Sequence, residues 1–313
     1  MTTINNRQST ITIGTRGSAL ALAQAKTVAD AITAQLGLRT ELVVIKTQGD
    51  RVTDRPLREL EWRGYFTKEI EEALLTGKID LAVHSFKDLP SKMPYGLVLA
   101  AVTEREDPGD VLICDADADV PPFNSPPRSR GENIRLKEGT VVGTSAVRRA
   151  VQLKSMRPDL AIKDLRGNVP TRLKRLSEGK YDAIMLACAG INRLNPDLSK
   201  YRVTKLDPTV FIPSPGQGAL AVQMREGDTR FEALHSLLHH EPTGIATSLE
   251  REVMVLFGGG CGLPLGVYAR QVGEEWEIHG FWGGNPERPV WATVKGKLDD
   301  GLTEYLYRKL NYI

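Results

Sequence analysis

Arginine is the residue type whose placement points most directly to chemistry in this sequence. Four arginines stand where a predicted strand gives way to a predicted helix: Arg16, Arg148, Arg149 and Arg166. In an open α/β sheet such points lie at the carboxyl ends of the strands, where ligands bind and helix amides favour anions. A guanidinium group matches a carboxylate with two parallel hydrogen bonds. These positions predict a site for a polycarboxylate or phosphate ligand, whereas Arg175 is better explained as a solvated helix residue.

An acid and a base follow the strand predicted over residues 79–85. They are Lys87 and Asp88 in the segment His84-Ser-Phe-Lys-Asp, and they should project at the same rim as the arginines. Such a pair beside an anion site suggests proton transfer or the stabilisation of a cation. Taken alone, a Lys-Asp pair is usually a surface ion pair, and His84 is more often a satisfied buried histidine than a catalyst.

Cys261 lies in the glycine-rich segment Phe257-Gly-Gly-Gly-Cys-Gly-Leu-Pro, where bulky neighbours are absent and a thiol is reachable. Cys114 and Cys188 lie in or beside apolar segments and are expected to be small buried hydrophobes. No protease-type base stands near Cys261 in the sequence, so a covalent attachment point is as plausible as a nucleophile that turns over. Three widely spaced cysteines fit neither a disulfide framework nor a zinc site, and we expect no metal site.

The composition is that of an ordinary globular protein. The chain has 313 residues, of which 41% are hydrophobic and 26% are charged, and this length predicts two or three domains. The longest apolar runs are strand-sized, well short of the roughly 20 residues that span a bilayer. A net charge of +2 does not imply nucleic acid as a partner. The first ten residues lack the order of a secretory signal, so we expect a cytoplasmic protein with no membrane or nucleic-acid partner.

Strands alternate with helices along much of the chain, which predicts mainly parallel sheets. In the first half, strands are expected over residues 11–15, 40–47 and 79–85, with helices after Ser18 and around residues 66–74. The pattern recurs later, where residues 140–144 lead into a helix from about Ala146 and residues 181–187 form another buried strand. Because Ile13-Gly-Thr-Arg is echoed by Val142-Gly-Thr-Ser, we expect two similar α/β halves.

Three further stretches divide the chain. Residues 115–135 are rich in Pro, Ser, Asn and Gly, which predicts a loop insertion. The segment Pro213-Ser-Pro-Gly-Gln-Gly precedes an apolar run over 219–224 that could return the chain to the first sheet, giving two linkers at one hinge. From Glu241 onward the pattern changes to a helix, three strand-like segments and a last helix, which predicts a small α+β domain.

An ordered series of motifs resembles the porphobilinogen deaminase family over nearly the whole chain. The motifs are Gly14-Thr-Arg-Gly-Ser-Ala-Leu-Ala, His84-Ser-Phe-Lys-Asp-Leu-Pro, Glu104-Arg-Glu-Asp-Pro, Gly143-Thr-Ser-Ala-Val-Arg-Arg, Leu165-Arg-Gly-Asn, Pro215-Gly-Gln-Gly-Ala and Gly259-Gly-Cys. Any one of them is weak, but the ordered series with a cysteine at its end is highly specific.

The resemblance implies an α/β fold of three domains. Residues 1–105 with 217–240 and residues 106–216 would form two doubly wound domains, similar to periplasmic binding proteins and joined by a hinge, and residues 241–313 a small α+β domain. It also implies a monomeric transferase of tetrapyrrole biosynthesis. Four porphobilinogens would be joined head to tail with loss of ammonia and released as hydroxymethylbilane, on a dipyrromethane cofactor held by a thioether to Cys261.

The resemblance further implies the roles of individual residues. Asp88 would be catalytic, facing the pyrrole nitrogens and stabilising the cationic azafulvene left when ammonia departs. The implied cofactor-binding residues are Ser85, Lys87, Asp88, Thr144, Ser145, Arg148, Arg149, Arg166, Gly167 and Cys261. The implied substrate-binding residues are Arg16, Ser18, Gln24, Phe66, Arg149, Arg172, Arg193 and Gln217. Each pyrrole carries an acetate and a propionate, so the cationic side chains would neutralise a growing negative charge.

Several positions depart from the family's usual pattern. Ala146 stands where a second serine is common, and Glu61-Trp-Arg-Gly replaces a more glycine-rich, lysine-bearing stretch. Two other functions explain part of the sequence. A non-catalytic, two-lobed anion-binding protein would account for the arginines without needing Cys261 or Asp88. A cysteine-dependent hydrolase would need a base paired with Cys261, for which the sequence offers no clear candidate.

Overall fold

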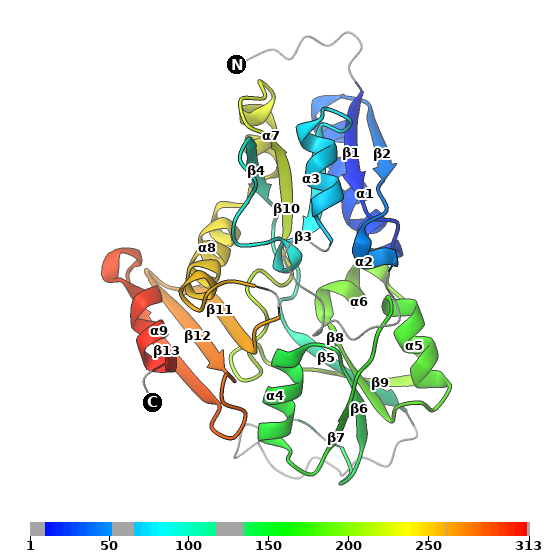
Figure 1. Cartoon of the computed structure of the whole chain (residues 1–313), viewed down its shortest axis with the longest axis vertical. Coiled ribbons are helices and arrows are strands. Elements are labelled where there is room, and N and C mark those ends of the chain that lie inside the picture. The colour runs from blue at the N-terminus through cyan, green and yellow to red at the C-terminus, as the bar shows by residue number, and fades with distance from the viewer. Residues whose placement is uncertain (1–9, 52–65, 117–133, 135, 261, 312–313) are drawn as a thin grey trace.

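The chain folds into three sheets with helices packed on them, shown by a computed structural model that describes residues 10–51, 66–116, 134, 136–260 and 262–311 (Figure 1). The first sheet lies at the top of the view, the second at the lower right and the third at the lower left. We call the first sheet with its helices the first lobe and the second sheet with its helices the second lobe. No helix among the described residues is long and apolar enough to cross a membrane.

The first sheet has the strand order β2-β1-β3-β10-β4. Its strands are β1 (Ile11–Thr15), β2 (Thr40–Val44), β3 (Leu81–Ser85), β4 (Leu97–Val102) and β10 (Leu220–Arg225). The helical elements of this lobe are α1 (Ala19–Leu36), α2 (Gln48–Arg51), α3 (Lys68–Leu75), the 3-10 turn η2 (Phe86–Asp88) and α7 (Phe231–Leu238). β1 pairs in parallel with β2 and β3, whereas β10 runs antiparallel to β3 and β4.

The second sheet repeats this plan with the strand order β7-β6-β8-β5-β9. Its strands are β5 (Asp110–Asp115), β6 (Val141–Gly143), β7 (Ala161–Lys163), β8 (Ala183–Ala187) and β9 (Tyr201–Lys205), and its helices are α4 (Val147–Met156), α5 (Val169–Ser177) and α6 (Cys188–Leu194). β6 pairs in parallel with β7 and β8, and β5 runs antiparallel to β8 and β9. The expected similarity of the two halves is confirmed by this shared pairing pattern.

Helices cover both faces of each sheet. In the first lobe, α1 and α7 share one apolar cluster with the sheet, and α3 belongs to another that includes Ile79, Ala82 and Leu97. In the second lobe, Leu153 of α4 lies in one cluster, whereas α5 and α6 contribute to another. The doubly wound α/β class predicted from the sequence is therefore confirmed.

The prediction of mainly parallel sheets is confirmed in strand direction, because four of the five strands in each sheet run the same way. The exceptions are β10 and β5, which enter from the opposite lobe and run antiparallel to both of their neighbours. The connections that carry the chain across are residues 103–109 and residues 206–219, which we call the first and second crossings. The apolar run over 219–224 does return the chain to the first sheet, as β10. Hydrophobic periodicity marks a buried strand but not its direction.

The third sheet has the order β11-β12-β13 and is entirely antiparallel. Its elements are α8 (Glu241–Leu256), β11 (Leu265–Val272), β12 (Glu275–Trp282), β13 (Val290–Gly296), the 3-10 turn η3 (Leu298–Asp300) and α9 (Leu302–Asn311). Both helices share one apolar core with the sheet, including the buried side chains of Val253, Ile278 and Leu306. The helix, three strands and final helix predicted from Glu241 onward are confirmed.

Element boundaries differ from the predictions by a few residues. β2 ends at Val44 rather than Thr47, and β3 begins at Leu81 rather than Ile79. The predicted insertion over 115–135 lies almost wholly outside the described residues, as does the Glu61-Trp-Arg-Gly segment.

Candidate active site

The lysine and the aspartate predicted as an acid–base pair lie on η2, directly after β3. The side chain of Asp88 is exposed, and Lys87 is half-buried. The Lys87 ammonium donates a hydrogen bond to Oε1 of Gln217, 3.1 Å away on the second crossing. This turn is therefore bonded to the crossing that returns the chain from the second lobe to the first lobe.

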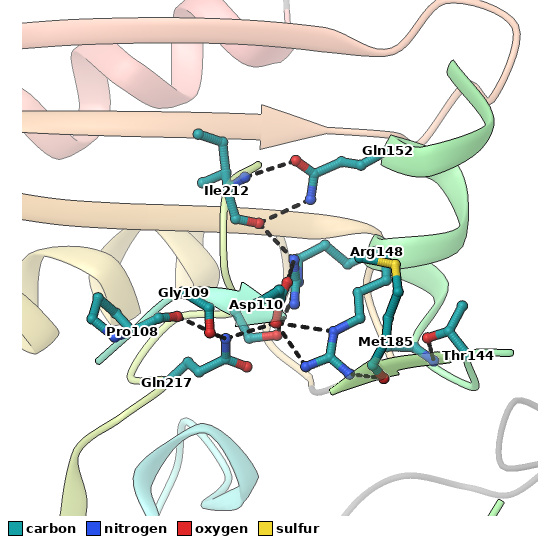
Figure 2. A network of polar contacts seen from close by, with 12 residues as sticks. Pro108, Gly109, Asp110, Thr144, Arg148, Gln152, Met185, Ile212 and Gln217 are labelled. Carbon is teal, nitrogen blue, oxygen red and sulfur yellow. Dashed lines mark hydrogen bonds and ion pairs between the residues drawn. The ribbon is translucent and has the colours of Figure 1, made fainter. Parts of the chain in front are cut away.

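Arg148 and Arg149 begin α4 and are almost completely buried, with 3% and 5% of their surface exposed. Asp110, the first residue of β5, lies between them (Figure 2). Oδ1 of Asp110 accepts from Nε and Nη2 of Arg149 at 3.0 and 2.7 Å, and Oδ2 lies 2.8 Å from Nη1 of Arg148. One buried carboxylate thus serves two buried guanidinium groups.

Backbone and side-chain acceptors take up further donors of both arginines. Nη1 of Arg149 donates to the Met185 carbonyl at 3.2 Å. Arg148 donates from Nε to Oγ of Ser214 and from Nη1 to the Ile212 carbonyl. In the structure both side chains are anchored by protein groups, so their orientation is fixed before any ligand binds.

Gln217 joins these groups to the crossings. Its Nε2 donates to the carbonyl groups of Pro108 and Gly109, at 2.7 and 3.2 Å, and to Oδ1 of Asp110 at 2.9 Å (Figure 2). Because its Oε1 accepts from Lys87, this one amide connects the first lobe, both crossings and the arginine pair.

The charges in this network shift two pKa values strongly. Burial alone would raise the pKa of Asp110, but Arg148 and Arg149 outweigh it and hold that pKa well below its usual range. The pKa of Lys87 is lowered to about 8, mainly by burial and also by Arg149 and Arg148, while Asp88 and Asp110 act in the opposite direction. The lysine keeps part of its surface exposed, yet the surrounding protein still desolvates its ammonium group. Lys87 therefore exchanges its proton near neutral pH.

A second group of cations surrounds Arg172 on α5. Burial lowers the pKa of Arg172 to about 10, as do the neighbouring charges of Arg149, Arg175 and Arg166, while Asp88 raises it. Asp88 of the first lobe thus acts on the charge of Arg172 in the second lobe. Positive charge gathered in this way is stabilised by an anionic ligand.

Contacts within this cation group leave one donor unused. Nε of Arg172 donates to the Gly167 carbonyl at 2.7 Å, and Nη1 of Arg175 donates to the Arg166 carbonyl at 3.0 Å. Nη1 of Arg166 is buried and has no hydrogen-bond partner among the described residues. A buried, unsatisfied guanidinium nitrogen is costly without an acceptor. The chemistry of these donors thus fits a carboxylated cofactor or substrate.

The predicted substrate-binding residues of the first lobe lie around the start of α1. The Arg16 guanidinium stacks on the Phe66 ring, with 4.1 Å between its central carbon and the ring centroid. Gln24 is buried and its Nε2 donates to Oγ of Ser85 at 2.8 Å. Ser18 is the N-cap of α1 and accepts from the Ala21 amide.

Three other predicted residues mainly contact the protein itself. Thr144 is buried and its hydroxyl accepts from the Ala146 amide at 3.3 Å, whereas Ser145 is half-buried. Arg193 donates to the Gly218 carbonyl, and burial lowers its pKa despite Glu106 nearby. Cys261 lies outside the described residues.

His84 is not placed for acid–base chemistry at neutral pH. It is buried, and burial lowers its pKa to about 4, with a smaller lowering from Arg16 and an opposing effect of Gln223. It was expected to be a satisfied buried histidine. It is buried, but its Nε2 has no hydrogen-bond partner among the described residues.

Sequence reasoning missed Asp110, the acid at the centre of the arginine network. Its signal was present but easily overlooked: a carboxylate directly precedes the apolar run Val111-Leu112-Ile113. A charged residue that opens a buried strand needs a partner. Nothing in the sequence indicated that both partners would come from α4.

Comparisons with known proteins agree on one family. Residues 11–233 match the family model described as porphobilinogen deaminase, dipyromethane cofactor binding domain. A probable porphobilinogen deaminase of Methanosarcina barkeri (strain Fusaro / DSM 804) is 45% identical over 94% of this chain and 85% of its own length. A porphobilinogen deaminase of Roseiflexus sp. (strain RS-1) is 42% identical over 93% of this chain and 91% of its own length.

Among solved structures, an ancestral cationic amino acid solute binding protein is similar with a TM-score of 0.42 and 14% identity, over 73% of this chain and 87% of that chain. A likeness this distant carries no argument about the site.

Proposed function

This chain belongs to the porphobilinogen deaminase family, and from that premise we propose how its residues divide the work. The chain is a transferase that joins four porphobilinogens head to tail with release of ammonia and yields hydroxymethylbilane for tetrapyrrole biosynthesis. Its cofactor is a dipyrromethane, which supplies the pyrrole end to which the first substrate is joined. The alternative of a non-catalytic anion-binding protein is disfavoured by the family match.

The residue roles are supported by the electrostatic effect of Asp88, in the first lobe, on Arg172 in the second lobe. An exposed carboxylate on η2 acts electrostatically on Arg172, which is surrounded by Arg149, Arg166 and Arg175. A carboxylated pyrrole has an anionic rim and a ring nitrogen that becomes cationic during reaction. The opposed charges of the two lobes match these two ends of one substrate.

Asp88 is the catalytic carboxylate in this proposal. Loss of ammonia leaves positive charge spread over a pyrrole ring and its methylene carbon, and the attacking pyrrole later sheds a proton. A carboxylate beside the ring nitrogens stabilises both cationic stages more than it stabilises the neutral ground state. Lys87, next to it, exchanges its proton near neutral pH and is placed to give a proton to the departing amine.

The arginines bind the acetate and propionate groups. Arg166 has a buried donor to offer, and Arg172 lies among like charges that an anion would relieve. Arg16, held against Phe66, supplies a cation from the first lobe. Ser85, Thr144, Ser145, Gly167, Gln24, Arg193 and Gln217 complete the proposed set, together with Ser18 at the start of α1. Cys261 is the proposed thioether attachment point.

We also propose the domain division, the assembly and the compartment. The three domains would be residues 1–105 with 217–240, residues 106–216 and residues 241–313. Support comes from the positions of the two crossings between the first and second sheets. The protein would act as a cytoplasmic monomer, which size-exclusion chromatography with light scattering and cell fractionation would test.

Intact-protein mass spectrometry tests the proposed attachment. The parent should carry an adduct of dipyrromethane mass, and Cys261→Ser should fold without it, because a hydroxyl is a far poorer nucleophile than a thiolate. Cys188→Ser is the matched control and should keep the adduct. A stable adduct on Cys261→Ser would contradict the assignment. A parent that binds carboxylated pyrroles but never carries an adduct or releases ammonia would instead be an anion-binding protein.

A further inference from the structure

The Asp110 side chain is completely buried at the point where the chain enters the second lobe. The resemblance assigns it no role. Three donors bond to its Oδ1, namely Nε and Nη2 of Arg149 and Nε2 of Gln217, whereas Oδ2 forms an ion pair with Nη1 of Arg148 (Figure 2). Because the carboxylate has no exposed surface, it is not available to a substrate, and its role must be exerted through the groups that it holds.

We propose that Asp110 is the positioning residue of Arg148 and Arg149, the two arginines assigned to the cofactor. Its carboxylate fixes their orientation and sets the net charge of the group. Gln217, which bonds to both Asp110 and Lys87, couples this charged group to Lys87. This inference rests on the proposed function for the identity of the bound anion. The residues acting directly on that anion remain Arg148 and Arg149.

Asp110 fixes the orientation of both guanidinium groups. Arg149 directs Nε and Nη2 at one oxygen of Asp110 and Nη1 at the Met185 carbonyl. Any swing of this side chain would break contacts to the carboxylate. Arg148 is likewise held between Asp110 and the Ile212 carbonyl. Two long side chains that would otherwise be flexible are thereby immobilised before the ligand arrives, which lowers the entropic cost of binding.

Asp110 also sets the net charge of the arginine pair. Arg148 and Arg149 bring two positive charges, and Asp110 brings one negative charge, so one positive charge remains in a place with little solvent. Leaving a buried charge uncompensated is unfavourable, and an incoming carboxylate removes that penalty. Without Asp110, the two guanidinium groups would repel each other. With a second acid beside them, the group would have no net positive charge to attract an anionic ligand.

Gln217 extends this effect to the first lobe. Its Nε2 donates to Asp110 while its Oε1 accepts from Lys87, so the acid and the lysine are held at the two ends of one amide. Four charged groups act on Lys87: Asp88 beside it on η2, Asp110 on β5, and Arg148 and Arg149 on α4. Asp110 is thus positioned to tune the proton affinity of a lysine in the opposite lobe.

Asp110→Asn tests the charge argument, with Asp107→Asn as the matched control. Asp107 lies on the first crossing, three residues before Asp110, but pairs with Lys205 at 3.0 Å instead of with the arginines. The pKa of Lys87 is measured from the pH dependence of its reaction with an amine-modifying reagent, followed by peptide mass spectrometry. We expect Asp110→Asn, and not Asp107→Asn, to lower it below the value measured for the parent, because Asp110 raises the pKa of Lys87. An unchanged or higher value in an Asp110→Asn protein that keeps the parent's melting transition would overturn the proposal.

Asp110→Glu separates position from charge. The longer side chain keeps the negative charge but cannot hold both guanidinium groups at their present distances. The pKa of Lys87 should stay near that of the parent, while the fraction of protein carrying the cofactor, read from the intact mass, should fall below that of Asp107→Glu. Equal cofactor loading would refute a positioning role.

The two tests also cover two kinds of failure. Should Asp110→Asn show no native melting transition, Asp110→Glu decides the question alone. A parent protein without any adduct would disprove the proposed function. The titration of Lys87 would still show whether Asp110 raises the pKa of Lys87.

Discussion

The strand that enters each lobe from the other begins differently in the two lobes. In the first lobe β10 begins with Leu220, which pairs with Ser85 at the end of β3. In the second lobe β5 begins with Asp110, which pairs with Ala187 at the end of β8. The strand order and pairing are the same, so these two positions correspond. The same backbone position therefore holds an apolar residue in the first lobe and a buried charge in the second lobe.

Buried polar groups elsewhere follow the same division. In the first lobe Gln223 of β10 donates to Glu71, and burial raises the pKa of that carboxyl group above its ordinary value. His84 nearby has a pKa lowered to about 4, so its neutral form prevails at neutral pH. The second lobe instead keeps Asp110 and both its arginines charged. Around these two buried strands, the first lobe has side chains whose pKa values are shifted toward the neutral form, whereas the second lobe has a compensated set of charges.

This difference suits the proposed division of labour. A carboxylated pyrrole needs fixed cations for its acid groups, and a buried ion network holds such cations rigidly. The ring nitrogen needs a carboxylate that is accessible, and Asp88 on an exposed turn meets that need. Each of the following predictions tests one part of this contrast.

The largest effect is expected when the ion network of the second lobe is broken. Arg149→Leu removes the partner that makes two contacts to Asp110 and leaves that carboxylate less compensated in the interior. Breaking a buried ion pair costs about 3–5 kcal/mol of stability. Denaturant titration should show this loss in the free energy of unfolding.

Lys174→Leu on α5 is the control for that variant. The Lys174 side chain is 76% exposed and its nearest acid, Glu178, lies 3.8 Å away. Its stability should stay within about 0.5 kcal/mol of the parent. Equal losses in both variants would mean that the network is not the stabilising feature of this lobe.

Asp88→Asn probes the first lobe, where a large effect on turnover should leave folding unchanged. Asparagine keeps the size of aspartate but lacks the charge that stabilises the cationic stages. Losing one well-placed electrostatic group costs on the order of a hundredfold in turnover, or about 3 kcal/mol. Turnover is assayed by oxidising the product to a coloured porphyrin, and folding by thermal melting.

The exposed side chain of Asp88 predicts an unchanged melting temperature. Asp159→Asn in the second lobe is a matched control, because that acid pairs locally with Arg157. Turnover of Asp88→Asn within about threefold of the parent, far from the loss expected for such a group, would make Asp88 an ordinary surface acid.

The sequence contained most of the fold and the outline of this site. Hydrophobic periodicity located the buried strands. The places where a predicted strand is followed by a predicted helix located Arg16 and the later arginines. Strand direction could not be read from the sequence, because β5 and β10 owe their antiparallel pairing to two crossings, residues 103–109 and 206–219, that are far apart in the chain. Asp110 could not be predicted for the same reason: its partners on α4 are brought to it only by the fold.

Acid should destabilise the first lobe through His84. Its folded pKa of about 4 lies below the ordinary 6.5, so the unfolded chain takes up a proton over this interval and the folded chain does not. The stabilisation is present above pH 6.5 and is lost as the pH falls toward 4. A difference between a pKa of 6.5 and one of about 4 corresponds to about 3–4 kcal/mol at most.

His84→Gln should remove this dependence, because glutamine does not titrate. Denaturant titrations from pH 7 to pH 4 would compare the variant with the parent, and the difference in their unfolding free energies should shrink or reverse as the pH falls. Glu71 acts in the opposite direction, since its raised pKa favours proton uptake by the folded state, but it is present in both proteins. Parallel pH profiles would show that His84 is accessible to protons in the folded state.

The smallest effects concern the first helices of the two lobes, which differ at their N-caps. Ser18 caps α1 with its hydroxyl group, which accepts from the Ala21 amide at 3.2 Å. In α4 the corresponding N-cap is Ala146, which has an extended backbone and no side chain able to accept. An N-cap serine contributes about 1 kcal/mol relative to alanine. Ser18→Ala should therefore lose about this much stability, and Ala146→Ser should gain a similar or smaller amount.

The pair also separates capping from ligand binding. If Ser18 serves only α1, then turnover at saturating substrate should not change in Ser18→Ala, whereas a substrate contact would raise KM. For Ala146→Ser the added hydroxyl lies next to Ser145 and two residues from Arg148, so a contact to a ligand carboxylate would increase cofactor retention as well as stability. Thermal melting, intact mass and KM distinguish these cases. A gain in stability with unchanged cofactor retention would show that Ala146→Ser supplies only a helix cap. The Thr144 hydroxyl already accepts from the Ala146 amide at the start of α4. If Ala146→Ser gains no stability, this existing contact is sufficient for the α4 terminus.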